Sequence, residues 1–180
     1  MAQGATIYNF EIELADNDRG VYETIELRVA RHPSESEDYL ITRVLAYCLE
    51  FQDGIAFSRG ISEPDEPAIA VRDLRGEIQV WIDIGWPDAA RLHKASKSAR
   101  RVAVYTHRDP TRFLAQLSGE RIHRGEAVEL YAIDRGLIAD LVARLDRRVA
   151  FSLSVNDREL YLSFDTDNLT GKVDRLKLHF

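Results

Sequence analysis

The sequence is poor in cysteine and has no long apolar run. Its 180 residues include a single cysteine, Cys48, so a disulfide framework cannot form within the chain. No apolar segment approaches the ~20 residues that a membrane-spanning helix needs, and the N-terminal residues lack the basic and apolar regions of a signal peptide. These absences predict a cytoplasmic protein with no membrane association, in which Cys48 is a packed core thiol.

Several motifs that carry a defined chemistry are also missing. The chain has no G-x-G-x-x-G, no G-x-x-x-x-G-K, no H-E-x-x-H and no pair of C-x-x-C motifs. Motif-based arguments for a dinucleotide cofactor, a P-loop, a zinc protease or a zinc finger therefore fail. The histidines share no metal-ligand spacing, which also argues against zinc.

Acidic residues outnumber basic ones, 30 to 24, and give a formal net charge of −6. Proteins that bind nucleic acid without sequence preference usually carry a basic footprint, so the overall charge argues against that class. Five of the 24 basic residues nevertheless lie in one short segment that contains no acid. They are Arg91, Lys94, Lys97, Arg100 and Arg101. This segment is compatible with contacts to phosphates at a single site.

The hydrophobic pattern predicts one α/β domain over residues 1–180, with a mixed sheet rather than a regularly repeating βαβ order. Ser34 and Glu37 are expected to form a capping box at the start of the first helix, and Asp134 is expected to cap the last. Strands are predicted at 5–14, 21–30, 57–61, 68–73, 77–84, 101–106, 127–133, 149–155, 160–164 and 173–178, and helices at 35–51, 87–99, 111–117 and 134–145.

An aspartate lies near the end of an apolar strand. Apolar residues alternate along the segment 77–85, and Asp83 falls on the opposite face from them. Burying a carboxylate there costs free energy unless a cation or a donor meets it. Asp65 and Glu66 precede the neighbouring predicted strand, and Lys94 lies on the helix that follows. Brought together, these residues could hold a divalent metal beside a phosphate.

Short motifs along nearly the whole chain resemble those of one family. They are Ala5-Thr-Ile-Tyr8, Ala30-Arg-His-Pro-Ser-Glu35, Arg59-Gly60, Asp65-Glu-Pro67, Trp81-Ile-Asp-Ile-Gly85, Pro87-Asp88, Arg91 and Lys94-Ala95. Together they resemble the YaeQ family of small bacterial proteins, which is regarded as a variant of the PD-(D/E)xK nuclease fold. The resemblance implies that fold here: a core of helix, three-stranded meander, helix and strand, with additional β-hairpins at both ends.

The resemblance also implies a metal-dependent site. Asp65 and Asp83 would be its two strand acids, Glu66 would lie beside the first, and Glu35 would be the acid from the helix. These carboxylates would hold Mg²⁺ or Mn²⁺ through hard oxygen ligands. The metal would activate a water and neutralise charge on the scissile phosphate.

The sequence departs from the nuclease pattern at the catalytic lysine. That pattern places a lysine two residues after the second acid, and the position is occupied here by Gly85. Lys94 could supply the ammonium from the following helix and stabilise the transition state. Arg91 and Lys97 would then contact the flanking phosphates.

Ordinary structural roles remain open for several of these residues. Asp65 and Glu66 lie between prolines, where acids commonly occupy exposed turns. Glu35 would complement the dipole at a helix N-terminus, and Arg31 and His32 could fix the corner between strand and helix.

The sequence therefore leaves two functions to compare. The first is a Mg²⁺-dependent nucleic-acid phosphodiesterase, which the combination of Asp65, Asp83 and Lys94 favours. The alternative is a non-catalytic module on the same fold, with a binding or regulatory role towards nucleic acid or protein. Gly85 and the acidic net charge favour that alternative.

Overall fold

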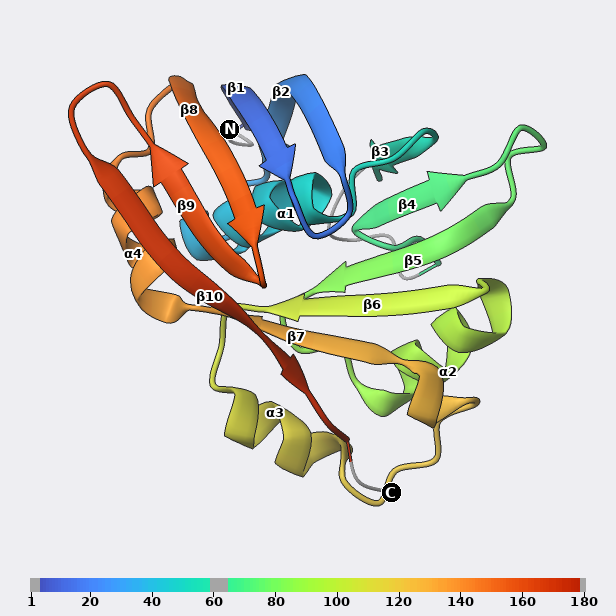
Figure 1. The fold of residues 1–180 in the computed structure, drawn as a ribbon. Coiled ribbons are helices and arrows are strands. Elements are labelled where there is room, and N and C mark those ends of the chain that lie inside the picture. The colour runs from blue at the N-terminus through green and yellow to red at the C-terminus, as the bar shows by residue number, and fades with distance from the viewer. Residues whose placement is uncertain (1–3, 59–64, 179–180) are drawn as a thin grey trace. The chain divides into compact units, whose positions relative to one another are not determined.

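The computed structural model describes residues 4–58 and 65–178 and has a mixed α/β architecture (Figure 1). Contacts along the chain divide it into unit 1, residues 1–41 and 133–174, and unit 2, residues 42–132 and 175–180. The α/β class predicted from the sequence is confirmed. A single domain over residues 1–180 stays a prediction.

Alternating apolar and polar residues build the sheet of unit 1. In β1 (Thr6–Asp16) the side chains of Phe10, Ile12 and Leu14 are buried and those between them are exposed, as expected for a strand with one solvated face. The strands follow the order β2-β1-β8-β9-β10, with β1 parallel to β8 and the other neighbours antiparallel. The other strands are β2 (Val21–Arg31), β8 (Arg148–Asn156), β9 (Glu159–Ser163) and β10 (Asn168–Leu176).

Unit 2 contains the strands that carry the predicted site. They follow the order β3-β4-β5-β6-β7, and the pairing changes from antiparallel in β3-β4-β5 to parallel in β5-β6-β7. Because parallel neighbours need a crossover, helices connect β5 to β6 and β6 to β7. The strands are β3 (Ile55–Phe57), β4 (Ile69–Arg72), β5 (Ile78–Ile84), β6 (Arg101–Thr106) and β7 (Glu129–Ile133).

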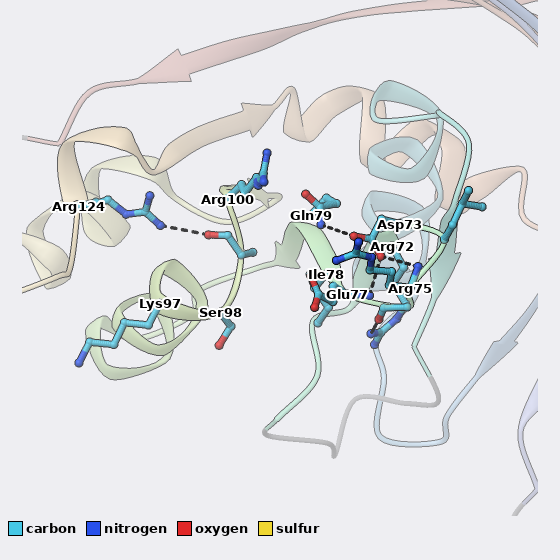
Figure 2. Close-up of a pocket in the computed structure, with 13 residues that line it drawn as sticks. Arg72, Asp73, Arg75, Glu77, Ile78, Gln79, Lys97, Ser98, Arg100 and Arg124 are labelled. Carbon is cyan, nitrogen blue, oxygen red and sulfur yellow. Dashed lines mark hydrogen bonds between the residues drawn. The ribbon is translucent and has the colours of Figure 1, made fainter.

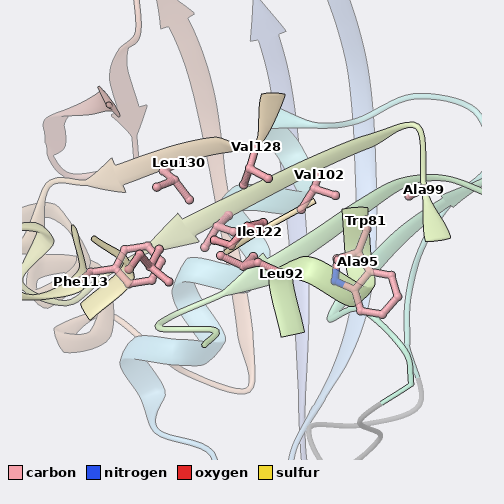
Figure 3. Close-up of a cluster of buried hydrophobic side chains, with 11 residues drawn as sticks. Trp81, Leu92, Ala95, Ala99, Val102, Phe113, Ile122, Val128 and Leu130 are labelled. Carbon is pink, nitrogen blue, oxygen red and sulfur yellow. The ribbon is translucent and has the colours of Figure 1, made fainter. Parts of the chain in front are cut away.

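The crossover helices of unit 2 pack on one face of its sheet (Figure 3). Leu92 from α2 (Ala89–Ser98) and Phe113 from α3 (Pro110–Leu117) are fully buried, and both join a cluster with Trp81 of β5. Burial of side chains of this size stabilises the fold by about 1.5–3 kcal/mol each. This packing fixes the start of α2 beside the C-terminal end of β5.

Helix α1 (Glu37–Leu49) begins at a different cap from the one predicted. The N–H of Tyr39 donates to the hydroxyl of Ser36 at 3.1 Å, so Ser36 is the N-cap. Ser34 instead lies 2.7 Å from Nδ1 of His32. The predicted capping box of Ser34 and Glu37 is therefore wrong.

Several strand boundaries differ from the predicted ones, because pairing with neighbouring strands decides where a strand begins and ends. The strand predicted at 57–61 is β3, which ends at Phe57, and positions 59–61 lie outside the described residues. The short helix η1 (Gly125–Ala127) delays the start of β7, and pairing of Leu169 with Leu162 starts β10 before the predicted residue 173. Helix α4 (Arg135–Ala143) begins after the N-cap Asp134, as predicted.

Cys48 is fully buried, which confirms its place in the core. Over the described ranges, we find no helix that combines the length and the apolar character needed to cross a membrane.

Candidate functional site

The C-terminal end of β5 carries Asp83, which is only 2% exposed. The Arg91 guanidinium from α2 meets its carboxylate with two parallel hydrogen bonds, Nε to Oδ2 at 2.7 Å and Nη2 to Oδ1 at 2.9 Å. A bidentate pair of this kind is among the stronger interactions available to a carboxylate. The cation that a buried Asp83 requires is therefore Arg91.

Further contacts hold Arg91 in this position. Its backbone N–H donates to the carboxylate of Asp88, the N-cap of α2, at 2.8 Å. Its Nη2 also donates to the backbone carbonyl of Glu66 at 2.8 Å, and its guanidinium carbon lies 5.4 Å from the ring centre of Trp81. Arg91 thus ties the 65–67 turn, β5 and the first turn of α2 together.

Lys94 lies one turn further along α2 and pairs with Asp65. Both side chains are accessible to water, with 48% of Lys94 and 75% of Asp65 exposed. Exposed ion pairs typically contribute less than about 1 kcal/mol. The structure therefore brings Lys94 to one of the predicted acids, in a pair that another ligand could open at little cost.

Gly85 directly follows β5 and has a conformation that a lysine would not readily adopt. Its φ is +87°, in the left-handed region that favours glycine, and its N–H donates to the carbonyl of Tyr105 at 2.9 Å. A side chain placed here would strain the backbone at the point where the chain leaves the sheet. The departure from the nuclease pattern at Gly85 thus has a conformational cause.

Glu35 belongs to unit 1, where it closes the corner between β2 and α1. Its carboxylate accepts the N–H of His32 at 3.4 Å, and its backbone carbonyl accepts from Arg31 at 2.9 Å. This supports the structural interpretation of Arg31 and His32. A role of Glu35 as a site acid stays a prediction.

The donor set around β5 does not fit a resident Mg²⁺ ion as it is arranged. Both oxygens of Asp83 accept from Arg91, and Asp65 is paired with Lys94. The contact made by Glu66 is through its backbone carbonyl. Residues 4–58 and 65–178 contain no group of three His, Cys, Asp or Glu that could hold a metal. A cation on Asp83 would have to displace Arg91.

A basic hollow of about 930 Å³ lies between the β4–β5 hairpin and the C-terminal end of α2 (Figure 2). Five basic and two acidic side chains line it. The basic ones are Arg72, Arg75, Lys97, Arg100 and Arg124. A region with this excess of cations stands out on a chain of net charge −6.

Two of the hollow's arginines are anchored and define its walls. Arg124 donates to the carbonyls of Ser96 and Ala99 at 2.6 and 3.2 Å, at the end of α2. Arg72 donates to the carbonyl of Gly76 at 2.9 Å, across the hairpin. Lys97, predicted to contact a phosphate, is exposed on the wall formed by α2.

Arg101, the last residue of the basic segment, belongs to a separate ionic network inside unit 2. Its guanidinium bonds Glu50 at 2.5 and 2.9 Å and Glu129 at 2.5 and 3.1 Å. The hydroxyl of Tyr105 donates to Glu50 at 2.6 Å, and that of Tyr131 to Glu129 at 2.6 Å. The network joins the end of α1 to β6 and β7.

This network shifts the pKa values of its members. Burial alone would raise the pKa of Glu129, but hydrogen bonds from Arg101 and Tyr131 and the charge of Arg101 outweigh it and lower the pKa. Burial, followed by the nearby charge of Glu50, raises the pKa of Tyr105 well above its usual value. Glu129 is therefore held ionised and Tyr105 is held neutral.

Sequence reasoning missed the partner of Asp83 and most of the basic hollow. The sequence did contain a signal for the partner of Asp83, because Arg91 lies in the first turn of the helix that follows the Asp83 strand. Arg72 and Arg75 flank a predicted hairpin turn, and this position could have indicated that they belong to one surface. Arg124 lies far from α2 in sequence and had no local signal.

Comparisons with known proteins agree on one family. The model of the family described as YaeQ protein matches residues 1–173. The chain belongs to the YaeQ family. Its curated relatives include the uncharacterized protein YaeQ of Escherichia coli (strain K12), 31% identical over 170 residues with 94% of each chain covered. That of Salmonella typhi is 31% identical over 174 residues, again with 94% of each covered.

Solved YaeQ structures share the fold of this chain. The crystal structure of YaeQ protein from Pseudomonas syringae has a TM-score of 0.86 at 28% identity, covering 96% of both chains. That from Xanthomonas axonopodis pv. citri has a TM-score of 0.87 at 29% identity, covering 97% of this chain and 99% of the other. The resemblance to the YaeQ family is thus confirmed.

Proposed function

We propose that this YaeQ-family chain is a non-catalytic nucleic-acid-binding module on a PD-(D/E)xK nuclease-like fold. The basic hollow is the observation that carries the proposal, because it gathers five cations on an otherwise acidic protein. The order α1, β3-β4-β5, α2, β6 is that of the nuclease core and supports the fold assignment. We expect binding through the nucleic-acid backbone.

The hollow offers the chemistry that a phosphate backbone requires. Lys97 and Arg100 are exposed and, within the described part of the chain, neither forms an ion pair. Arg75 and Leu74 lie at the tip of the β4–β5 hairpin, where Leu74 is fully exposed and offers an apolar contact to a base. Cations release counterions from phosphates, so binding should weaken steeply with salt.

Ion pairing at the predicted site acids supports a non-catalytic role. Asp83 is neutralised by Arg91, and Asp65 by Lys94, before any ligand arrives. The lysine of the nuclease pattern is replaced by Gly85, whose backbone disfavours any other residue. None of these residues lines the hollow, so phosphate contacts are left to the hollow itself.

A Mg²⁺-dependent phosphodiesterase at Asp65, Asp83 and Lys94 stays the second proposal. The contact between Lys94 and Asp65 favours it, because a lysine does reach one of the predicted acids. It requires Arg91 to leave Asp83. The participation of Glu66 and Glu35 in this site stays a prediction.

Fluorescence anisotropy with labelled single-stranded DNA, duplex DNA and RNA tests the first proposal. The double variant K97E/R100E should bind more weakly than the parent and reduce the slope of log K against log salt by about 2. The control R112E/R147E changes the net charge equally at exposed positions that do not line the hollow. It should keep the parental slope.

The outcomes separate the two proposals. Equal losses of nucleic-acid affinity in both double variants, or no binding to any of the three nucleic acids, would overturn the proposal of a binding module. Mg²⁺-dependent cleavage that is lost in D83N, together with calorimetric Mg²⁺ binding lost in the same variant, would establish the phosphodiesterase instead. Without cleavage, loss of binding confined to K97E/R100E supports the non-catalytic module.

A further inference from the structure

The solvent-facing side of the unit 1 sheet carries a groove of about 540 Å³ with a tyrosine at each side. Strand pairing places Tyr22, Ala15, Ser154 and Tyr161 in one row across β2, β1, β8 and β9. Neighbouring strands are about 4.8 Å apart, so the two tyrosine backbones are about 14 Å apart. Small residues between them leave the floor open.

Both tyrosine rings are exposed and held in place. Tyr22 is 62% exposed and Tyr161 is 40% exposed. The hydroxyl of Tyr22 donates to Asn17 at 2.7 Å, and that of Tyr161 donates to Glu159 at 2.7 Å. Because these bonds fix the rings before binding, a ligand that stacks on them loses less conformational entropy.

The charge of the groove selects the ligand. Its lining includes the acid Glu13, on the same face of the sheet as both tyrosines, and no lysine or arginine. Glu13 projects into the row next to the tyrosines, facing Ser152 on β8 and Thr24 on β2. Carboxylates next to exposed aromatic faces repel phosphates and favour cations, which the rings also attract.

We infer that this groove binds a basic peptide segment of a partner protein, in extended conformation across the strands. A lysine or arginine lies over each tyrosine, and Glu13 faces the segment between them. An extended chain advances about 3.4 Å per residue, so residues i and i+4 span the about 14 Å between the two tyrosines. The hydroxyls of Ser152, Ser154 and Ser163 line the floor and are available to the peptide backbone.

Anisotropy titrations with labelled nine-residue peptides test this inference. One peptide carries Arg at positions 3 and 7 in a Gly/Ser background, a second carries Arg at 3 and 5, and a third carries Glu at 3 and 7. The first should bind most tightly and the third not at all. Tyr22→Ala and Tyr161→Ala should each weaken binding of the first peptide about three- to fivefold, and Glu13→Gln should weaken it about twofold.

Matched variants distinguish a binding role from a structural one. Tyr22→Phe and Tyr161→Phe keep the rings and should retain most of the affinity, and Glu126→Gln, an exposed change in unit 2, should have no effect. The midpoint of urea unfolding checks that each alanine variant remains folded. K97E/R100E should leave peptide binding unchanged, so this test is independent of the nucleic-acid proposal.

Several results would overturn the inference. They are equal binding of the i,i+4 and i,i+2 peptides, insensitivity to both alanine variants, and absence of saturable binding at the highest soluble peptide concentration. Binding of a neutral oligosaccharide in place of the peptide would assign the groove to a carbohydrate. Sedimentation showing a dimer that Tyr22→Ala dissociates would assign it to a second copy of the chain.

Discussion

At the scale of single residues, two acid–base pairs in unit 2 differ in their exposure to water. Asp83 and Arg91 have side-chain exposures of 3% and 28%, whereas Asp65 and Lys94 have 75% and 48%. A buried charge that loses its partner keeps its desolvation cost, while an exposed one returns to water. The same type of ion pair should therefore contribute very differently to stability at these two places.

We predict that Arg91→Met lowers the free energy of unfolding by about 3–5 kcal/mol, because it leaves a buried Asp83 carboxylate without its cation. Asp83→Asn should cost less, since the partly exposed Arg91 can turn to solvent. Urea unfolding monitored by circular dichroism measures both. The exposed pair provides the control: Asp65→Asn and Lys94→Gln should each cost less than about 1 kcal/mol. Equal losses at both pairs would contradict this account.

Residue type and position predicted part of this site. An aspartate within an apolar strand signalled the need for a cation, and the pattern on α2 placed Lys94 near Asp65. Which cation met Asp83 could not be decided, because Arg91 and Lys94 lie on the same helix and differ by one turn. The choice depends on how α2 packs through Leu92 and Ala95, which is a tertiary property.

At the scale of helices and strands, the local sequence pattern predicted those features that depend on neighbouring residues alone. Alternation predicted both strands of the β1–β2 hairpin, and a capping aspartate predicted the start of α4. Strand boundaries that depend on pairing with a neighbouring strand could not be predicted from the local sequence. For example, β10 begins at Asn168 because this residue pairs with β9. The start of α1 was also misplaced, since Ser34 and Ser36 both precede it.

The cap of α1 yields a prediction that separates these two serines. Ser36→Ala removes the hydroxyl that accepts the N–H of Tyr39 and should lower the free energy of unfolding by about 1 kcal/mol. Ser34→Ala removes only the contact with His32, at an exposed position, and should have a smaller effect. Thermal unfolding of the two variants side by side measures the difference. A larger loss in Ser34→Ala would restore the capping box.

At the scale of the whole molecule, the interactions least visible in the sequence join residues far apart along the chain. Arg101 connects Glu50 and Glu129, which lie 51 and 28 residues away from it. Arg101 belongs to the basic segment whose charge is compatible with phosphate contacts. Its partners became apparent only once α1, β6 and β7 were assembled, because hydrophobic periodicity does not specify which distant charges meet.

This network predicts how stability depends on pH. The pKa of Glu129 is lower in the folded chain than the ordinary value of 4.5, since bonds from Arg101 and Tyr131 outweigh its burial. Its contribution is therefore fully present above about pH 4.5 and is lost as pH falls through the lower folded pKa. Glu129→Gln should thus be destabilising at pH 7, and the difference from the parent should narrow below pH 4.5. Urea unfolding from pH 7 to pH 3 measures this, with Glu126→Gln as the exposed control. A difference that stays constant over the range would show that Glu129 acts through packing rather than through its charge.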